Sequence, residues 1–184
     1  MIDPGYLRLH ADAMGVLTAW DHPEPEQRML REDYLRFLRE FPEGMSRDCG
    51  TGHVTASALV MDEGRTRVLL TLHPKVGRWL QLGGHCEVGD ETLLAAARRE
   101  TIEESGIPTV AMSEQPIRLD RHPVPCGGSM NEHLDVQYLA LVPADATAIM
   151  SAESDDLQWF PVDALPSPLD PSVRAIIATA LREH

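Results

Sequence analysis

The chain has 184 residues, of which 43% are hydrophobic, and a formal net charge of −13 at pH 7. This length predicts one main domain that buries about 70% of the surface exposed by the unfolded chain. The acidic excess argues against binding to DNA or long RNA, because such binding depends on Lys and Arg neutralising phosphates. No apolar run of roughly 18 residues occurs, so we expect no membrane-spanning helix.

The three cysteines, Cys49, Cys86 and Cys126, are odd in number and lack the spacing of a metal site. Such usage is typical of reduced thiols in a cytoplasmic protein. The N-terminal residues also lack the basic start and apolar run of a secretory signal. We therefore expect a cytoplasmic location.

Helical spacing of apolar residues appears first at residues 5–20 and 25–41. Prolines at 23, 25 and 42 interrupt the pattern and end each segment. We interpret residues 1–50 as a helical extension packed on a main domain of residues 51–184. Covering a sheet surface or a dimer seam fits this extension better than serving as a lid over a substrate.

Strand-like sequence follows. Residues 53–61 and 68–72 flank a turn at 62–64 and predict a hairpin, and residues 78–82 predict a third short strand. A helix is expected after Gly89.

The predicted helix has clear end signals. Asp90 or Thr92 is the expected N-cap, and Gly106 the expected end. Beyond the helix we expect strands at 117–122, 133–142 and 157–160, with a Pro/Gly loop at 123–128. A C-terminal helix at 172–182 opens with Pro171. This order of elements is typical of an α+β fold.

Three carboxylates, Glu100, Glu103 and Glu104, are spaced i, i+3 and i+4 on the central helix. This spacing places them on one side, where like charges repel each other. The opposite side, with Ala95 and Ile102, should face the core. Oxygen ligands gathered beside a glycine loop suit a hard cation, Mg²⁺ or Mn²⁺.

Residues 83–107, GGHCEVGDETLLAAARRETIEESGI, resemble the signature of the Nudix hydrolase family. That signature is a glycine, five residues, a glutamate, seven residues and then Arg-Glu-apolar-x-Glu-Glu-x-Gly-apolar. Residues 99–107 match it, except that Thr101 stands where an apolar residue is usual. Counted from Gly84, the motif is one residue longer than usual. Either Asp90 fills the acidic position and one residue is inserted before Arg99, or Glu91 fills it and the loop is one residue longer. Leu82 stands where the family usually has a proline.

The resemblance implies a Nudix-type α/β/α sandwich with a mixed sheet over residues 51–184. It also implies Mg²⁺-dependent cleavage of a phosphoanhydride in a nucleoside diphosphate linked to another group, with Mn²⁺ as a substitute. The implied metal-binding and catalytic groups are Glu100, Glu103, Glu104 and the carbonyl of Gly83. Arg99 is expected to pair with a loop carboxylate: Glu87, Asp90 or Glu91.

Other residues are candidates for holding a small nucleotide or diphosphate substrate. These are Lys75, Arg78, Gly84, Arg121, His133 and Asp135. The general base is either Glu100 or an acid of a later loop: Glu132, Glu153, Asp155 or Asp156. A zinc site at His122, His133 and Asp135 near Cys126 is an alternative, although this spacing fits no common zinc site.

Two other functions remain open. One is a regulatory module that binds nucleotides without turnover, although such a module has no need of three repelling carboxylates. The other is a prenyl-diphosphate isomerase, which would use Cys86 as a catalytic residue. A homodimer could form through an exposed edge strand or the N-terminal helices. The motif specifies diphosphate chemistry and leaves the substrate undetermined.

Overall fold

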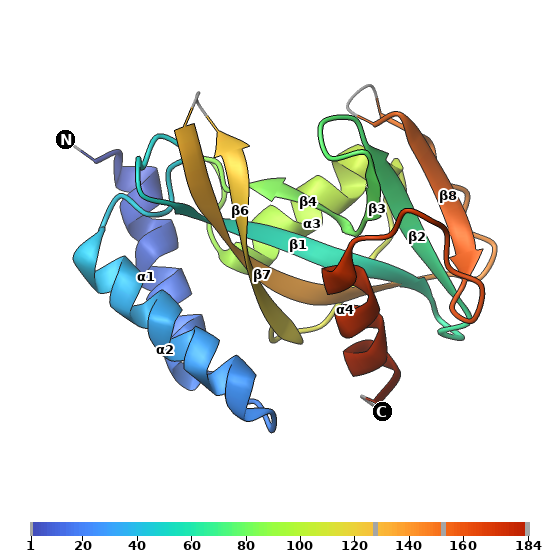
Figure 1. Ribbon diagram of the computed structural model, residues 1–184, viewed down its shortest axis with the longest axis horizontal. Helices are drawn as coiled ribbons and strands as arrows, with labels where there is room; N and C mark the ends of the chain where they lie inside the picture. Colours follow the sequence, from blue (N-terminus) through green and yellow to red (C-terminus); the bar gives the residue numbers. More distant parts are fainter. Residues whose placement is uncertain (1, 127–128, 152–153, 183–184) are drawn as a thin grey trace.

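A mixed β-sheet forms the centre of the computed structural model, which describes residues 2–126, 129–151 and 154–182 (Figure 1). Its main strand order is β3-β2-β1-β7-β5, with β4 paired to β1, β6 to β7 and β8 to β2. The strands are β1 His53–Asp62, β2 Arg67–His73, β3 Arg78–Leu80, β4 Leu82–His85, β5 Ala111–Met112, β6 Arg118–Cys126, β7 Ser129–Val142 and β8 Asp156–Pro161.

The register of β1 explains how the glycine-containing strand reaches the middle of the sheet. One edge of β1 runs parallel to β7 over its whole length. Its other edge pairs with β4 over residues 55–58 and with β2 near Val60 and Met61. Strand β2 then turns away to pair with β3 and β8, which curls the sheet. Gly83 and Gly84 of β4 therefore lie opposite buried residues of β1.

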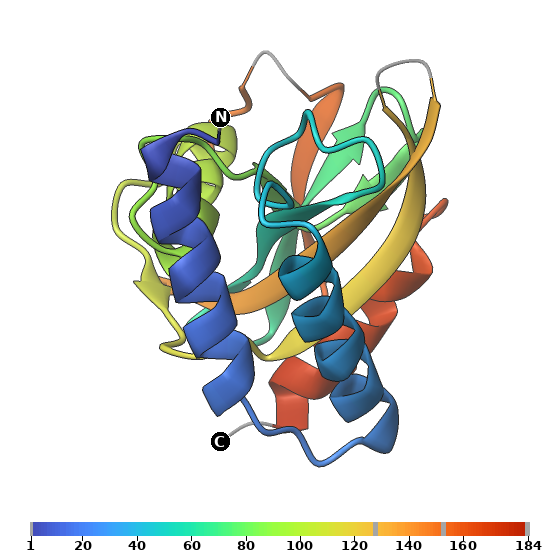
Figure 2. The ribbon, with the colours of Figure 1, turned by 90° about the vertical axis from the view of Figure 1, so that its left-hand side faces the viewer.

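In the part of the chain that the structure describes, four helices cover the two faces of the sheet: α1 Pro4–Ala19, α2 Pro25–Glu40, α3 Leu93–Ser105 and α4 Pro171–Arg182. Helices α1, α2 and α3 share one buried apolar cluster with Val54, Ala56 and Val60 of β1. Helix α4 packs in a second cluster with Leu59 and Met61, whose side chains alternate to the other face. Figure 2 shows α1 and α2 side by side against the sheet. The predicted α+β sandwich with its N-terminal helices is confirmed.

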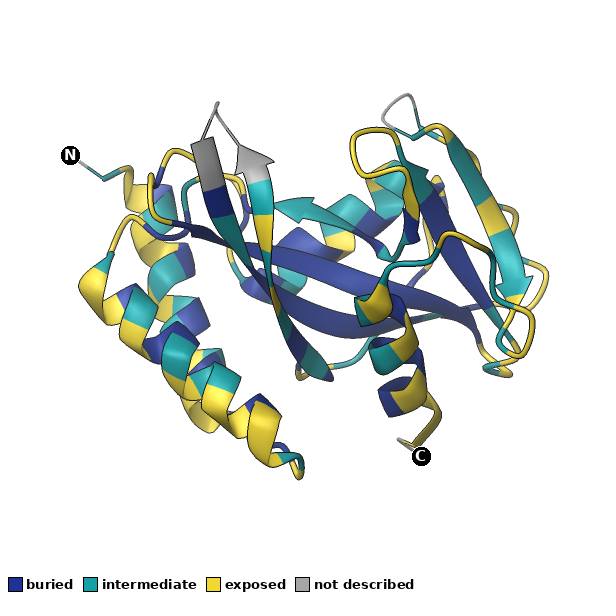
Figure 3. Cartoon of the chain, viewed as in Figure 1, coloured by how far each residue is buried: buried dark blue, intermediate teal, exposed yellow. Residues whose placement is uncertain are grey.

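Burial follows this layered arrangement. Strand β1 is buried at every position, and the described middle of β7 is buried as well (Figure 3). The helices alternate between buried and exposed faces. Among the described residues, no helix is both long and apolar enough to cross a bilayer.

Several predicted boundaries need correction. Residues 78–82 form two strands rather than one, because β3 pairs with β2 while β4 pairs with β1. Residues 123–126 belong to β6 instead of a loop, since their backbone pairs with β7. The two-residue strand β5 was not predicted at all.

The buried face of α3 differs in part from the prediction. Its buried residues are Leu93, Ala96, Ala97, Thr101 and Ser105. Ile102 is partly buried and packs against the core as predicted, whereas Ala95 is only partly buried. Thr101 fits where an apolar residue is usual because its hydroxyl donates a hydrogen bond of 2.7 Å to the carbonyl of Ala97. A buried hydroxyl that is hydrogen-bonded avoids most of its desolvation cost.

Polar contacts join the N-terminal helices to the sheet. Trp20 Nε1 donates to the carbonyl of Pro116 at 2.5 Å, and the hydroxyl of Tyr34 donates to the carbonyl of Asp120 at 2.6 Å. The Gln27 amide accepts a hydrogen bond from the N–H of Leu119 at 2.7 Å and donates to the carbonyl of Leu119 at 3.1 Å. These bonds fix α2 along the free edge of β6.

Candidate active site and histidine cluster

Two glycines of β4 bring the strand backbone close to its neighbours. A Cβ atom on Gly83 would lie 2.3 Å from the Cβ and 2.5 Å from the Cα of Ser57, and the φ of Gly83 is +152°. A side chain is therefore excluded there by both space and conformation. A Cβ atom on Gly84 would lie 2.8 Å from Oε1 of Glu100. The absence of a side chain at Gly84 thus lets the Glu100 carboxylate rest on the strand.

Helix α3 begins and ends as its sequence predicts. Thr92 is the N-cap, and its hydroxyl accepts a hydrogen bond from the N–H of Ala95 at 3.0 Å. Gly106 ends the helix in the left-handed conformation, with φ +66°. These ends set the position of the three glutamates relative to β4.

The three glutamates of α3 do not have equivalent positions. Glu104 accepts a hydrogen bond from the backbone N–H of Gly83 through Oε2, at 2.9 Å. Glu100 lies against Gly84, and its side chain is 13% exposed. Glu103 is 60% exposed and contacts Arg99. The structure therefore brings Glu100 and Glu104 to the two glycines, while Glu103 lies at the rim.

Arg99 joins the loop to the helix. Its Nε and Nη2 donate to the two carboxylate oxygens of Asp90, at 3.0 and 2.9 Å. Nη2 also donates to the carbonyl of His85 at 3.0 Å, and Nη1 to Glu100 at 2.9 Å and Glu103 at 3.1 Å. The hydrogen bonds with Asp90 are the main reason why the pKa of Arg99 is raised. Of the three predicted loop partners, Asp90 is the one that pairs with Arg99.

Asp90 also organises the loop itself. Its Oδ2 accepts a hydrogen bond from the N–H of Glu87 at 2.8 Å, and the residue is only 6% exposed. Glu91, the other candidate for the acidic position, is exposed. This difference favours Asp90 as the acidic residue of the motif.

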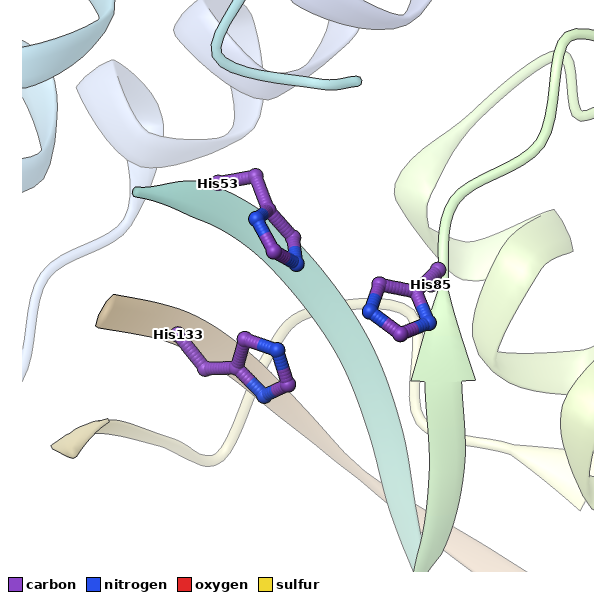
Figure 4. A group of neighbouring side chains, drawn as sticks. All are labelled: His53, His85 and His133. Atoms are coloured by element: carbon purple, nitrogen blue, oxygen red, sulfur yellow. The ribbon is translucent and has the colours of Figure 1, made fainter. Parts of the chain in front are cut away.

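Three histidines form a second group beside the glycines (Figure 4). They are His53 at the start of β1, His85 at the end of β4 and His133 near the start of β7. Their ring centroids lie 4.7 to 5.3 Å apart, and one potential ligand atom from each lies within 4.8 Å of the others. Burial lowers the pKa of His53 to about 4 and that of His133 to about 3. All three rings are therefore expected to be neutral at pH 7.

Only one member of this group could be predicted from the sequence. His133 was a candidate, but His53 and His85 were not, because the sheet register is what joins them. His53 lies opposite His133 in the parallel pair, and His85 lies opposite Thr55. The alternative zinc group of His122, His133 and Asp135 is brought together only in part. The ring centroid of His122 lies 5.5 Å from that of His133, but its Nδ1 pairs with Asp120, and the oxygens of Asp135 accept hydrogen bonds from β1. The side chain of Cys126 is outside the described part of the chain.

Asp135 lies beneath the surface, two residues from His133. Its oxygens accept hydrogen bonds from the hydroxyls of Thr55 at 2.9 Å and Ser57 at 2.6 Å and from the Gln137 amide at 3.0 Å. It is 3% exposed, and burial raises its pKa. Asp135 therefore contributes to the polar interior that supports β1 and β7.

The remaining predicted residues that the structure describes lie at least partly exposed on the surface. Lys75, Arg78 and Asp155 are exposed, around the turn between β2 and β3 and the segment before β8. Arg121 forms an ion pair with Glu132, which engages both side chains. Glu153 lies outside the described residues. Within the described residues, Lys75 and Arg78 form no ion pair with a carboxylate.

Solved structures with the same fold are Nudix proteins. A Nudix-family hydrolase from Clostridium perfringens is 26% identical, with 71% of this chain and 98% of that chain covered and a TM-score of 0.57. A MutT Nudix hydrolase from Burkholderia pseudomallei is 25% identical, with 68% and 95% covered and a TM-score of 0.53. The Nudix domain of Shewanella oneidensis NrtR, complexed with ADP ribose, is 24% identical, with 71% and 87% covered and a TM-score of 0.55. A comparison with curated proteins gave no match.

The family model described as the NUDIX domain matches residues 51–180. This range includes the glycines of β4, the whole of α3 and all three clustered histidines. The chain therefore belongs to the Nudix family and is a Nudix hydrolase.

Proposed function

We propose that this chain is a Mg²⁺-dependent pyrophosphohydrolase that cleaves a phosphoanhydride in a nucleoside diphosphate linked to another group. The observation that carries the proposal is the arrangement of two carboxylates on the paired glycines. Glu104 contacts the Gly83 N–H, and Glu100 lies against Gly84. Oxygen ligands from one helix and one strand, gathered at a single point, are the donor set that Mg²⁺ prefers. Mn²⁺ accepts the same ligands.

Each residue has a distinct proposed role. Glu100, Glu104 and the carbonyl of Gly83 hold the cation, and Glu103 contributes directly or through water. Bound Mg²⁺ would neutralise charge on the diphosphate and lower the pKa of a coordinated water. Arg99 keeps the helix in register with the loop through Asp90. It acts as a positioning residue.

The general base is proposed among Glu100, Glu132, Glu153, Asp155 and Asp156. Of these, Glu132 lies in β7 and Asp156 begins β8. Glu100 is favoured because it already lies at the glycines. Glu132 is less favoured because Arg121 engages its carboxylate. A base must reach the attacking water within about 3 Å, directly or through one further water.

A small nucleotide is the proposed substrate. Solved structures of the same fold include a Caenorhabditis elegans Ap4A hydrolase and an Escherichia coli dihydroneopterin triphosphate pyrophosphohydrolase. At 18% identity each, they support the fold and suggest compounds for testing. Lys75 and Arg78 are proposed to contact the substrate phosphates because both are exposed cations close to β4 in the sequence. We further propose a cytoplasmic location for the enzyme.

Two alternatives have weaker support. A silent binding module would gain nothing from holding Glu100 and Glu104 together, because like charges repel. A prenyl-diphosphate isomerase would need Cys86 as a catalytic residue. That thiol is 2% exposed, and burial raises its pKa, so it is a neutral core side chain.

The test compares wild type with Glu104→Gln on a panel of nucleoside triphosphates, sugar nucleotides and dinucleotides. Phosphate and nucleotide release are measured with Mg²⁺, with Mn²⁺ and with EDTA. We expect metal-dependent turnover that falls by about 10²-fold or more in Glu104→Gln. Glu91→Gln is the control, because Glu91 is exposed, and should keep wild-type activity. Ligand binding without turnover in wild type would favour the silent module instead.

A further inference from the structure

The side chains of His53, His85 and His133 point toward a common space from three neighbouring strands (Figure 4). Their ring centroids are 4.9 Å apart for His53 and His85, 4.7 Å for His53 and His133, and 5.3 Å for His85 and His133. Each of the three histidines belongs to a different strand of the same sheet. The strand pairing fixes the backbone positions of all three.

Four of the six ring nitrogens are buried and have no hydrogen-bond partner among the described residues. His53 is 0% exposed, and neither of its ring nitrogens has a hydrogen-bond partner among the described residues. The same is true of Nε2 of His85 and Nε2 of His133, which are also buried. A buried polar atom without a partner costs about 1–3 kcal/mol. If the three imidazoles only packed in the core, these unpaired nitrogens would destabilise the folded chain and no interaction would offset the loss.

We propose that His53, His85 and His133 bind a divalent transition-metal ion, with Zn²⁺ as the best candidate. Imidazole nitrogen suits Zn²⁺, Co²⁺ and Ni²⁺, whereas Mg²⁺ prefers oxygen ligands. Zn–N bonds of about 2.0–2.1 Å in a tetrahedron require nitrogens about 3.4 Å apart. The nitrogens are within 4.8 Å of one another. Ring rotations that move each nitrogen by less than about 1 Å complete the site.

Nearby charges have opposite effects on such a site. Burial is the main cause of the lowered pKa values of His53 and His85. Arg47 lowers both further, and Lys75 lowers that of His85. Their repulsion weakens the binding of a cation but keeps the rings neutral, as metal ligands must be. Asp48 faces His53 and acts in the opposite sense. Three neutral ligands also leave a fourth tetrahedral position for water or a substrate oxygen.

This site is separate from the carboxylates proposed to bind Mg²⁺. Gly84 faces α3, as its contact with Glu100 shows, and the next residue, His85, alternates to the other face of β4 beside Thr55. The two sites nevertheless share one residue, because the carbonyl of His85 accepts the hydrogen bond from Arg99. The inference goes beyond the proposed hydrolysis and stands without it.

The test uses full-length protein without an affinity tag, stripped with EDTA and dialysed. Co²⁺ is titrated in the presence of excess Mg²⁺, and the visible absorption of four-coordinate Co²⁺ is recorded. Metal content is then measured by mass spectrometry after Zn²⁺ loading. We expect one Co²⁺ per chain, displaced by Zn²⁺ and unaffected by Glu104→Gln. The Glu104→Gln arm separates this site from the carboxylates.

Variants decide which residues hold the ion. His133→Gln and His85→Gln should each weaken Co²⁺ binding by about 10²-fold or more, because even outer-shell changes cost 10–100-fold. His22→Asn is the matched control, since His22 is also buried but lies outside the cluster. Its Co²⁺ affinity should equal that of wild type. Circular dichroism of each metal-free variant establishes that it is folded.

Other outcomes would overturn the proposal. Wild type that binds no Co²⁺ or Zn²⁺ in excess Mg²⁺ removes the site, and so does unchanged binding in both folded histidine variants. If neither variant folds, the melting temperature of wild type decides, because an ion that binds only the folded chain must raise it increasingly as the ion concentration exceeds the dissociation constant. A rise with inorganic phosphate but not with Zn²⁺ would mean that the histidines hold an anion.

Discussion

Asp12 of α1 accepts a hydrogen bond from the backbone N–H of Leu93, the first residue of α3, through Oδ2 at 2.8 Å. The N-terminal N–H groups of a helix have no partner within the helix, so this carboxylate satisfies one of them from a distant segment. Burial raises the pKa of Asp12, which means that its charge is partly desolvated. The N-terminal extension therefore supports the helix that carries the three glutamates.

Replacing Asp12 separates the role of its oxygen from that of its charge. Asp12→Ala should lower the free energy of unfolding by about 1 kcal/mol, the usual cost of losing a capping oxygen. Asp12→Asn should keep wild-type stability or exceed it, because an amide oxygen accepts the same bond without a desolvated charge. Urea denaturation of the three proteins measures the difference. Equal losses in both variants would contradict this account.

The pair between Arg99 and Asp90 should contribute to stability as well as to positioning. Asp90 is 6% exposed, and its carboxylate accepts two hydrogen bonds from Arg99. Asp90→Asn removes the negative charge from this pair. We expect a loss of about 2 kcal/mol, less than the full cost of breaking a deeply buried pair because Arg99 is 21% exposed. Thermal unfolding should show a fall of about 4–8 °C. Glu91→Gln, an exposed neighbour, should leave the melting temperature unchanged.

Gly84 should affect activity more than stability. A Cβ atom in Gly84→Ala would meet the carboxylate of Glu100 at 2.8 Å, and the end of a glutamate side chain can move aside. We therefore expect turnover to fall by about 10-fold or more, with a stability change below about 1 kcal/mol. Gly89→Ala is the control, because nothing lies within 4 Å of its added Cβ atom. Full activity in Gly84→Ala would show that the position of Glu100 is not critical.

His22 should make stability depend on pH. It is 6% exposed, burial lowers its pKa, and its Nδ1 accepts a hydrogen bond from the N–H of Glu24, which only an unprotonated nitrogen can do. Below about pH 6.5 the unfolded chain binds a proton that the folded chain resists, so stability is lost as pH falls. Each such group contributes at most about 1.4 kcal/mol per pH unit.

The measurement is the melting temperature between pH 7.5 and 5 in EDTA. His22→Asn keeps an acceptor near the position of Nδ1 but cannot be protonated in this range. We expect its melting temperature to fall less steeply than that of wild type. Parallel curves would assign the pH dependence to other groups.

The sequence predicted the elements whose signals are local. The helix from Leu93 to Ser105 has its cap at Thr92 and its end at Gly106 within one continuous segment, so both ends could be predicted. The side of that helix facing the core was harder, because Thr101 is polar and yet fully buried. Its hydroxyl finds a partner in the preceding turn, which hydrophobic patterning does not register.

Features that depend on strand register could not be predicted. His53 and His133 meet only because β1 and β7 run parallel with these two residues opposite each other. A shift of one residue would turn either side chain to the other face of the sheet. The selection of Asp90 over Glu91 as the partner of Arg99 likewise depends on the shape of the loop, since both are acidic and adjacent.

The side chain of Gln27 hydrogen-bonds to the outer edge of β6 in the way that a neighbouring strand would. Its side-chain amide offers Leu119 one acceptor and one donor, which are the two groups that the backbone of a neighbouring strand would present. A second molecule could add a strand here only by first displacing α2. The chain thus protects itself at this edge from intermolecular β-pairing and the aggregation that follows from it.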